Sequence, residues 1–194
     1  MRTASVERKT EETEIKLDLN LDGKGESDIS SPLKFLNHML KSFSKHSGFD
    51  LRVEANGDVE VEDHHLVEDL GICIGESLDK ALGDKCGIER IAHSLVPMDD
   101  SIATVAVDLG GRPYSLVEIK FSEFKDAKLG DVSKENIPHF FESLALNGKL
   151  NLYLKVEGAN DHHRVEACFK ALARALRDAS RVSGDGIPST KGVI

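Results

Sequence analysis

The sequence predicts an α+β fold built from two copies of one small two-layer unit, each a sheet with two helices on one face. Apolar and polar residues alternate strictly in the expected strands, so each sheet should have one apolar face that helices cover. The order of strands and helices recurs in the second half, and a hexapeptide at 63–68 recurs at 161–166. We expect a first half-domain over residues 1–92 and a second over residues 93–194.

In the first half, alternation across 13–23 predicts a half-buried strand that ends in a turn. Apolar residues at helical spacing across 31–43 predict a helix. Alternation returns at 51–55 and again at 59–61, which indicates further strand structure. A long helix should follow, because apolar residues lie four apart on one stripe: Leu66, Leu70, Ile74, Leu78 and Leu82.

The second half repeats this order of elements. Alternating residues predict strands over 103–109, 116–121 and 150–156. Apolar residues at helical spacing predict helices over 137–146 and 165–176. Each half therefore contains strands followed by a shorter helix, another strand and a long helix.

The composition limits the class of protein. With 194 residues and 40% hydrophobic content, the chain can form one domain or two small fused halves. A net charge of -9 argues against non-specific binding to nucleic acids or anionic membranes. The N-terminal segment is charged, and no apolar run approaches the length of a membrane span. Three scattered cysteines fit a reducing, cytoplasmic location.

The most distinctive feature is the repeated hexapeptide, Asp-His-His-Leu-Val-Glu at 63–68 and Asp-His-His-Arg-Val-Glu at 161–166. Each copy begins a long helix, and its aspartate is well placed to cap the helix N-terminus. A histidine in an aromatic-rich helix, His38 or His139, lies upstream of each copy. Adjacent helical residues point about 100° apart, so the two histidines of a pair cannot easily face one ion.

These residues fit a metal site. Residues at i and i+4 share a helix face, which assigns His64 and Glu68 to one ion and His65 to another, and likewise in the second copy. The full set suits two six-coordinate ions, each with three imidazoles, one carboxylate and open positions. Imidazole and carboxylate without thiolate favour Mn, Fe, Co, Ni or Zn over Mg or Ca. The candidate ligands are His38, His64, His65, Glu68, His139, His162, His163 and Glu166.

At these residues the chain resembles the imidazoleglycerol-phosphate dehydratase family, and the match runs nearly from end to end. It rests on motifs that include F-L-N-H-M-L (35–40), D-H-H-x-V-E-D (63–69), G-R-P-Y (111–114), D-H-H-R-V-E-A-x-F-K-A (161–171) and P-S-T-K-G (188–192). The resemblance implies a duplicated unit with the fold of the second domain of ribosomal protein S5, and a homo-oligomer of 24 subunits. It also implies two Mn²⁺ ions per active site at subunit interfaces, held by the eight residues above.

The implied reaction is dehydration of D-erythro-imidazoleglycerol phosphate to imidazole-acetol phosphate in histidine biosynthesis, by a monofunctional enzyme without a fused phosphatase domain. The carbon-bound proton to be removed is not acidic, and metal ions on the imidazole nitrogens would stabilise an imidazolate as Lewis acids do. Glu12 resembles the family's acid/base residue that is not a ligand. Glu166 could combine ligation with proton transfer, and the sequence leaves the two roles open. His46 and Asp99 are weaker catalytic candidates.

Four further residues match the family's phosphate-binding positions: Arg90, Arg112, Ser189 and Lys191. Arginine suits bidentate contacts with phosphate, and a hydroxyl and an ammonium group lie on a polar C-terminal tail that we expect to become ordered when substrate binds. The sequence departs from the family's pattern at three positions, none of them a proposed ligand: Leu66, Tyr153 and Asp100.

Three other classes of function compete with this interpretation. A di-metal hydrolase needs bridging carboxylates that hold its ions about 3.5–4 Å apart, whereas each copy supplies only one glutamate beside adjacent histidines. A non-catalytic metal-binding shell would not need Glu12, Arg90, Arg112 or the C-terminal tail. A plain structural domain would not need the duplicated histidines.

Overall fold

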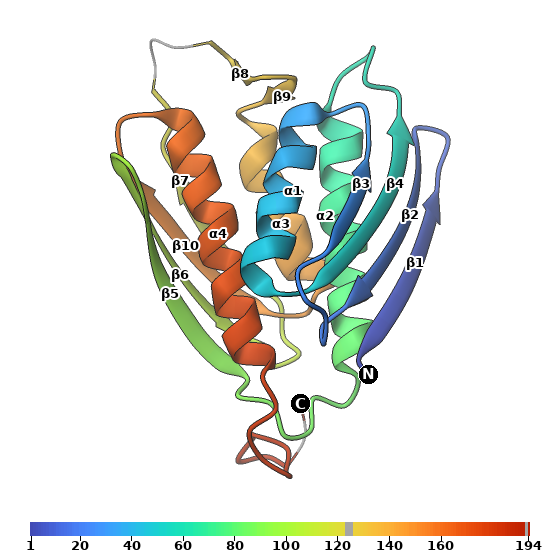
Figure 1. Cartoon of the computed structure of the whole chain (residues 1–194), viewed down its shortest axis with the longest axis vertical. Helices are drawn as coiled ribbons and strands as arrows, with labels where there is room; N and C mark the ends of the chain where they lie inside the picture. Colours follow the sequence, from blue (N-terminus) through green and yellow to red (C-terminus); the bar gives the residue numbers. More distant parts are fainter. Residues whose placement is uncertain (123–125, 193) are drawn as a thin grey trace.

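The computed structural model describes residues 1–122, 126–192 and 194 (Figure 1). The first half contains β1 (Thr3–Lys9), β2 (Thr13–Asn20), β3 (Ser27–Ser30), α1 (Lys34–Ser47), β4 (Asp50–Gly57) and α2 (His64–Leu82). The second half contains β5 (Ile91–Met98), β6 (Ser101–Asp108), β7 (Tyr114–Ile119), α3 (Asn136–Asn147), β10 (Asn151–Glu157) and α4 (Asp161–Ser180). A short hairpin precedes α3, formed by β8 (Lys128–Leu129) and β9 (Val132–Ser133).

The two halves have the same sheet topology, with strand orders β1-β2-β4-β3 and β5-β6-β10-β7. In each sheet the first three strands pair in antiparallel fashion, and the last strand pairs in parallel with the third. This repeated arrangement confirms the duplicated α+β fold that the sequence predicts. The second sheet begins at Ile91, beside the expected division between residues 92 and 93.

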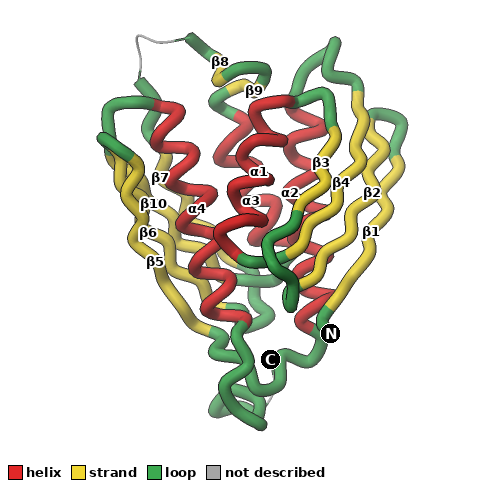
Figure 2. Tube along the Cα trace, viewed as in Figure 1, coloured by secondary structure: helices red, strands yellow, loops and turns green. Residues whose placement is uncertain are grey.

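All four long helices lie between the two sheets (Figure 2). In the first half α2 packs on β1 and β2, and α1 packs on β3; in the second half α4 packs on β5 and β6, and α3 packs on β7. The helices also pack across the halves, α2 against α3 and α1 against α4. Each of these two helix pairs therefore joins one half-domain to the other.

The α2–α3 contact is close because α2 carries two glycines where it meets α3. A Cβ atom at Gly71 would lie 2.6 Å from the carbonyl oxygen of Phe140, and one at Gly75 would lie 2.5 Å from that of Leu144. Neither position has room for a side chain, so the two backbones touch directly. All four helices begin at the same end of the molecule (Figure 1), which brings their first turns together there.

The core is one apolar cluster that extends through both halves. It includes the predicted stripe of α2 and the thiols of Cys73 and Cys168. Burial raises the pKa of the Cys73 thiol to about 12, so this group is a packing residue rather than a reactive thiolate. None of the helices formed by the described residues is both long enough and apolar enough to cross a membrane.

Two features of local structure differ from the sequence-based expectations. The strand structure expected around Val59 and Val61 is wrong, because this segment turns back through a hydrogen bond from Val61 N to Asp58 O and Val61 is 71% exposed. The pattern also does not predict β1, β3 or β5. β3 has four residues, and β5 exposes Ile91 and Leu95, so neither strand shows a readable alternation of buried residues.

Candidate metal centre

The two copies of the histidine motif form the first turns of α2 and α4, and the two upstream histidines lie on α1 and α3. Because α1 packs on α4 and α2 packs on α3, His38 lies beside the motif of the second half and His139 lies beside that of the first. Each group of candidate ligands is thus assembled from both halves. Residue spacing does not reveal this exchange, because it depends on how the halves pack.

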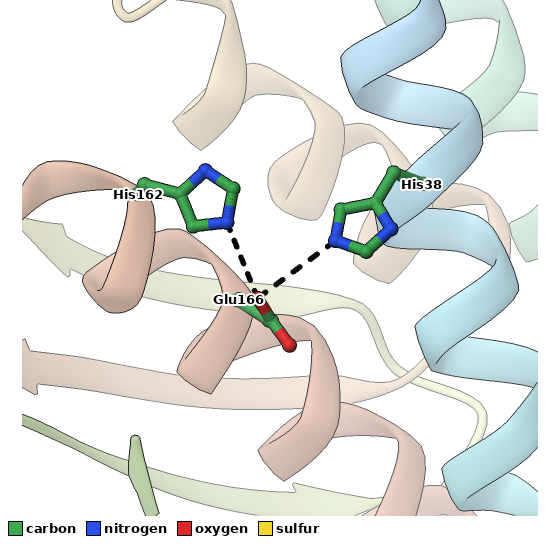
Figure 3. A group of neighbouring side chains, drawn as sticks. All are labelled: His38, His162 and Glu166. Carbon is green, nitrogen blue, oxygen red and sulfur yellow. Dashed lines mark hydrogen bonds and ion pairs between the residues drawn. The ribbon is translucent and has the colours of Figure 1, made fainter. Parts of the chain in front are cut away.

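The first group, here named the α1–α4 cluster, consists of His38, His162 and Glu166 (Figure 3). The Nε2 atoms of His162 and His38 lie 3.3 and 3.9 Å from the same oxygen, Oε2 of Glu166. The potential ligand atoms of all three residues lie within 4.8 Å of one another. Both rings point toward the carboxylate, so one cation could bind all three side chains.

The second group, the α2–α3 cluster, consists of His64, Glu68 and His139. Nε2 of His64 lies 3.6 Å from Oε2 of Glu68, and the ring centroids of His64 and His139 are 5.6 Å apart. In both clusters the side chains at i and i+4 face each other, as helical spacing predicts. The same set of two histidines and one glutamate therefore occurs twice, on two different helix pairs.

The carboxylates of the two clusters have different surroundings. Glu166 is 8% exposed, and its Oε1 lies 2.7 Å from Nζ of Lys170. Burial raises the pKa of the Glu166 carboxyl, but the hydrogen bond and charge of Lys170, together with the His162 hydrogen bond and the His38 charge, lower it below its ordinary value. The side chain of Glu68 is 45% exposed, and Ile72 occupies the position equivalent to Lys170.

The histidines of the α2–α3 cluster are held at Nδ1. Nδ1 of His64 lies 3.0 Å from Oδ1 of Asn136, and Nδ1 of His139 lies 3.2 Å from Oε2 of Glu142. The amide of Asn136 is oriented by its Nδ2, which donates to Asp63. Because the Asn136 oxygen is an acceptor, the facing Nδ1 of His64 must carry the proton, and Nε2 of the neutral His64 ring keeps its lone pair.

The histidines of the α1–α4 cluster are supported differently. Among the described residues, neither His38 nor His162 has a hydrogen bond at Nδ1. Phe35 instead packs edge-on against the ring of His162, with 5.5 Å between centroids. Phe35 precedes its cluster histidine by three residues, as Asn136 precedes His139, so equivalent positions contact the opposite half through an aromatic edge and an amide respectively.

The second histidine of each motif points away from its cluster. The ring planes of His64 and His65 make an angle of 87°, and those of His162 and His163 make an angle of 89°. In both pairs the centroids are 6.1 Å apart. Neighbouring histidines therefore face different directions, as the 100° step of an α-helix predicts.

Carboxylates hold both of these outward histidines. Nδ1 of His65 lies 3.2 Å from each carboxylate oxygen of Asp58, and Nδ1 of His163 lies 2.7 Å from Oδ1 of Asp100. The hydrogen bond with Asp58 raises the pKa of His65, and the hydrogen bond with His163 lowers the pKa of Asp100. Both rings have side chains that are 27% exposed.

Two of the predicted catalytic residues lie near Nε2 of these rings, the nitrogen that Asp58 or Asp100 does not contact. Oε1 of Glu12 is 3.7 Å from Nε2 of His65, and Oδ2 of Asp99 is 3.4 Å from Nε2 of His163. Glu12 precedes β2 and Asp99 precedes β6, so the two carboxylates occupy equivalent hairpin turns. The structure thus brings a predicted acid/base candidate to each outward histidine.

The prediction that Asp63 and Asp161 cap the long helices through their side chains is wrong. Asp63 occupies the N-cap position of α2 without a capping hydrogen bond, and Asn160, rather than Asp161, caps α4. Both aspartates are buried, and most of their partners lie outside their own helices. The partners of Asp63 are Lys128, Ser133 and Asn136, and those of Asp161 include Ser122, Lys134 and Arg164.

The donor set fits a divalent transition-metal ion. Each cluster offers two imidazoles and one carboxylate and no thiolate, a combination that suits Mn, Fe, Co, Ni or Zn better than Mg or Ca. Within one chain, each cluster supplies three of the four ligands that the sequence assigns to each ion.

The predicted phosphate-binding residues gather near the opposite end of α4. The backbone N–H of Arg90 donates to the carbonyl of Ala179, one residue before α4 ends. At a rise of 1.5 Å per residue, about 25 Å of helix separates Ala179 from His162. Arg112 lies beside Gly111, against which Ile194 packs. Within one chain the structure therefore does not bring these residues to either cluster.

The C-terminal tail lies against Arg90. The guanidinium of Arg90 binds both carboxylate oxygens of Asp108, at 2.7 and 3.0 Å, and donates to the carbonyl of Pro188 at 2.8 Å. Ser189 and Lys191 follow, and the Ser189 hydroxyl accepts from the backbone N–H of Lys191. The expected ordering of this tail by substrate stays a prediction.

Four further residues contact the candidate ligands but are not among the predicted site residues: Asp58, Asn136, Glu142 and Lys170. The last two lie three and four residues, respectively, from a candidate ligand on the same helix, so helical spacing could have identified them. Asp58 contacts His65 from the loop after β4, and Asn136 contacts His64 from the other half of the molecule. Helical spacing predicts neither contact. His46, proposed as a weaker catalytic residue, is half-buried on α1; burial and the charges of Lys170 and Arg174 lower its pKa.

Known proteins resemble the chain over almost its full length. The family model described as imidazoleglycerol-phosphate dehydratase matches residues 31–176. The imidazoleglycerol-phosphate dehydratase of Methanothermobacter thermautotrophicus is 55% identical over 192 residues, which cover 99% of this chain and 97% of that protein.

Solved structures give the same result. The crystal structure of imidazoleglycerol-phosphate dehydratase from Staphylococcus aureus has 35% identity and a TM-score of 0.82, with 94% of this chain and 99% of that chain covered. The crystal structure of IGPD from Pyrococcus furiosus in complex with (S)-C348 has 32% identity and a TM-score of 0.83, with 97% and 100% covered. The chain therefore belongs to the imidazoleglycerol-phosphate dehydratase family and is a hydro-lyase of histidine biosynthesis.

Proposed function

We propose that this chain dehydrates D-erythro-imidazoleglycerol phosphate to imidazole-acetol phosphate in a Mn²⁺-dependent step of L-histidine biosynthesis, within an assembly of 24 subunits. The observation that carries the proposal is the pair of incomplete clusters, each with two histidines and one glutamate. Membership of the dehydratase family supports the reaction, and the donor set supports the metal.

The incomplete clusters support an active site shared between copies of the chain. Each cluster has three donors, while His65 and His163 contact Asp58 and Asp100 rather than the residues of either cluster. The candidate phosphate-binding residues lie about 25 Å along α4 from the α1–α4 cluster. In a closed symmetric assembly, a neighbouring chain would supply both the fourth ligand of each cluster and the phosphate-binding residues. Each chain would give these groups to one neighbour and receive them from another.

Two ions per site would be held by the two clusters, each completed by His65 or His163 of another copy. Bound there, the ions supply Lewis-acid polarisation of the substrate's imidazole ring. The chain's own residues then have two tasks, which are to move protons and to hold the phosphate.

The reaction removes a carbon-bound proton and a hydroxyl group as water and leaves an enol, which becomes the ketone. Glu166 is poorly suited to move the proton, because Lys170 engages one of its oxygens and the cluster histidines engage the other. Glu12 is 54% exposed, with an oxygen 3.7 Å from His65. We therefore assign proton transfer to Glu12 and place Asp99, in the equivalent turn, as the second candidate.

Phosphate binding falls to Arg90, Arg112, Ser189 and Lys191. Arg90 is fixed by Asp108, which leaves the nitrogen that now donates to the Pro188 carbonyl as its adjustable donor. A substrate phosphate would replace that carbonyl and gain a charge-assisted hydrogen bond.

The test is to strip the full chain of metal, restore Mn²⁺ and follow formation of imidazole-acetol phosphate through the alkali absorbance of its enol. We expect Mn²⁺-dependent turnover that falls by at least about 100-fold in His64→Ala and in His162→Ala, since each variant removes a ligand from one cluster. Two bound Mn²⁺ per chain without turnover would contradict the dehydration and leave a metal-binding shell as the better description.

A further inference from the structure

The outward histidines share an arrangement that the duplication alone does not explain. His65 and His163 are equivalent in the repeat, and each has Nδ1 against an aspartate. The aspartates are not equivalent: Asp58 follows β4, seven residues before its histidine, whereas Asp100 lies in the β5–β6 turn, 63 residues before its own. The same contact is thus made from two different places in the fold.

We propose that Asp58 and Asp100 are positioning residues that hold His65 and His163 with Nε2 presented as a metal-binding atom to the cluster of a second copy of this chain. The inference rests on the proposed function, because it assumes that the clusters bind metal and are completed by another copy. It assigns a role to two side chains that are not themselves proposed ligands.

The carboxylate acceptor determines which ring nitrogen carries the proton. An ionised carboxylate has no hydrogen to donate, so the ring nitrogen that faces it must carry the proton. In a neutral imidazole the other nitrogen, Nε2, then holds the lone pair that a metal requires. The contact also fixes the plane of the ring, and such carboxylate–histidine pairs typically orient metal ligands. Recruitment of a carboxylate from unrelated positions indicates that the contact itself is needed.

Asp58 offers the cleaner test of the two. Among the described residues, the hydrogen bonds of its side chain go only to His65. Asp100 also accepts from the backbone N–H groups of Ala159 and Asn160, so its removal would loosen the start of α4. Glu62 provides a matched control, because its carboxylate lies 3.9 Å from Nε2 of His65, on the other side of the ring, and is 56% exposed.

The experiment titrates the full chain with Mn²⁺ and measures free Mn²⁺ by electron paramagnetic resonance. For Asp58→Ala we expect one of the two ions per chain to bind about 10–100-fold more weakly while the other keeps its affinity. Asp58→Asn retains an oxygen acceptor and should recover part of the loss. Glu62→Gln should bind both ions as the wild type does.

A second readout needs no metal. In long-range ¹H–¹⁵N spectra of the metal-free chain, His65 should carry its proton at Nδ1 in the wild type and distribute it between both nitrogens in Asp58→Ala. Wild-type affinity for both ions in Asp58→Ala, equal weakening of both, or a wild-type proton at Nε2 would overturn the positioning role. A wild-type chain that binds no Mn²⁺ would instead overturn the proposed function.

Discussion

The α1–α4 and α2–α3 clusters each contain two histidines and one glutamate, yet a different part of each cluster is fixed. In the α1–α4 cluster the carboxylate is buried and paired with Lys170, whereas its histidines have no Nδ1 hydrogen bond among the described residues. In the α2–α3 cluster His64 is hydrogen-bonded to Asn136 and His139 forms an ion pair with Glu142, whereas the carboxylate of Glu68 is 45% exposed.

The two copies of the repeat therefore share the candidate ligands but differ in the residues that hold those ligands in place. A pair of groups is oriented when either partner is held, so anchoring the carboxylate and anchoring the rings are alternative solutions. The charges diverge with the supports. Lys170 compensates Glu166, whereas Glu142 adds a second carboxylate to the α2–α3 cluster.

The largest expected difference is in the stability of Glu166→Gln and Glu68→Gln. Glu166→Gln leaves the ammonium of Lys170, whose side chain is 17% exposed, without its charged partner. We expect this to lower the free energy of unfolding by about 1–3 kcal/mol. Glu68→Gln alters a half-exposed side chain and should change the free energy of unfolding by less than about 0.5 kcal/mol. Urea denaturation of the metal-free chain measures both values, and equal losses would show that Lys170 does not anchor the carboxylate.

Lys170→Met should have a smaller effect that depends on pH. With Lys170 present the pKa of Glu166 is lowered, so the ionised carboxylate stabilises the fold above its unfolded pKa of about 4.3. That contribution disappears as the pH falls through the folded pKa. Without Lys170, burial raises the pKa and only the His162 hydrogen bond and the His38 charge oppose it, so the ionised form is stabilised less. The destabilisation caused by Lys170→Met should therefore be greatest near pH 6 and shrink below pH 4.

A surface pair provides the control for that pH series. Lys80 and Glu76 form an i,i+4 ion pair at 3.4 Å with side chains that are 54% and 39% exposed. Lys80→Met should change the unfolding free energy by less than about 0.5 kcal/mol at every pH. If Lys170→Met behaved in the same way, the proposed difference between the two carboxylates would not hold.

The comparison also shows which features can be predicted from sequence. β2, β6 and β10 lie inside their sheets with one buried face, so their alternation is regular, whereas the edge strand β5 exposes apolar residues and hides its pattern. The i,i+4 pairs are local and follow from helical geometry. The exchange of His38 and His139 between halves depends on helix packing, including the side-chain-free contact at Gly71, and no local rule predicts it.

The smallest expected difference between paired variants concerns the equivalent positions Asn136 and Phe35. Asn136→Ala removes the hydrogen bonds to His64 and Asp63 and should lower the free energy of unfolding by about 1 kcal/mol. Phe35→Leu keeps most of the apolar contact and loses only the ring edge against His162, which should cost about 0.5 kcal/mol. The sharper contrast lies in the proton positions, which ¹⁵N spectra of the metal-free chain report. In Asn136→Ala the proton of His64 should no longer be confined to Nδ1 and should distribute between both ring nitrogens. Phe35→Leu should leave the proton position of His162 unchanged, because an aromatic edge accepts no hydrogen bond from Nδ1. If both variants shifted the proton of their histidine, the rings of the two clusters would be held alike, and the difference between the clusters would reduce to their carboxylates.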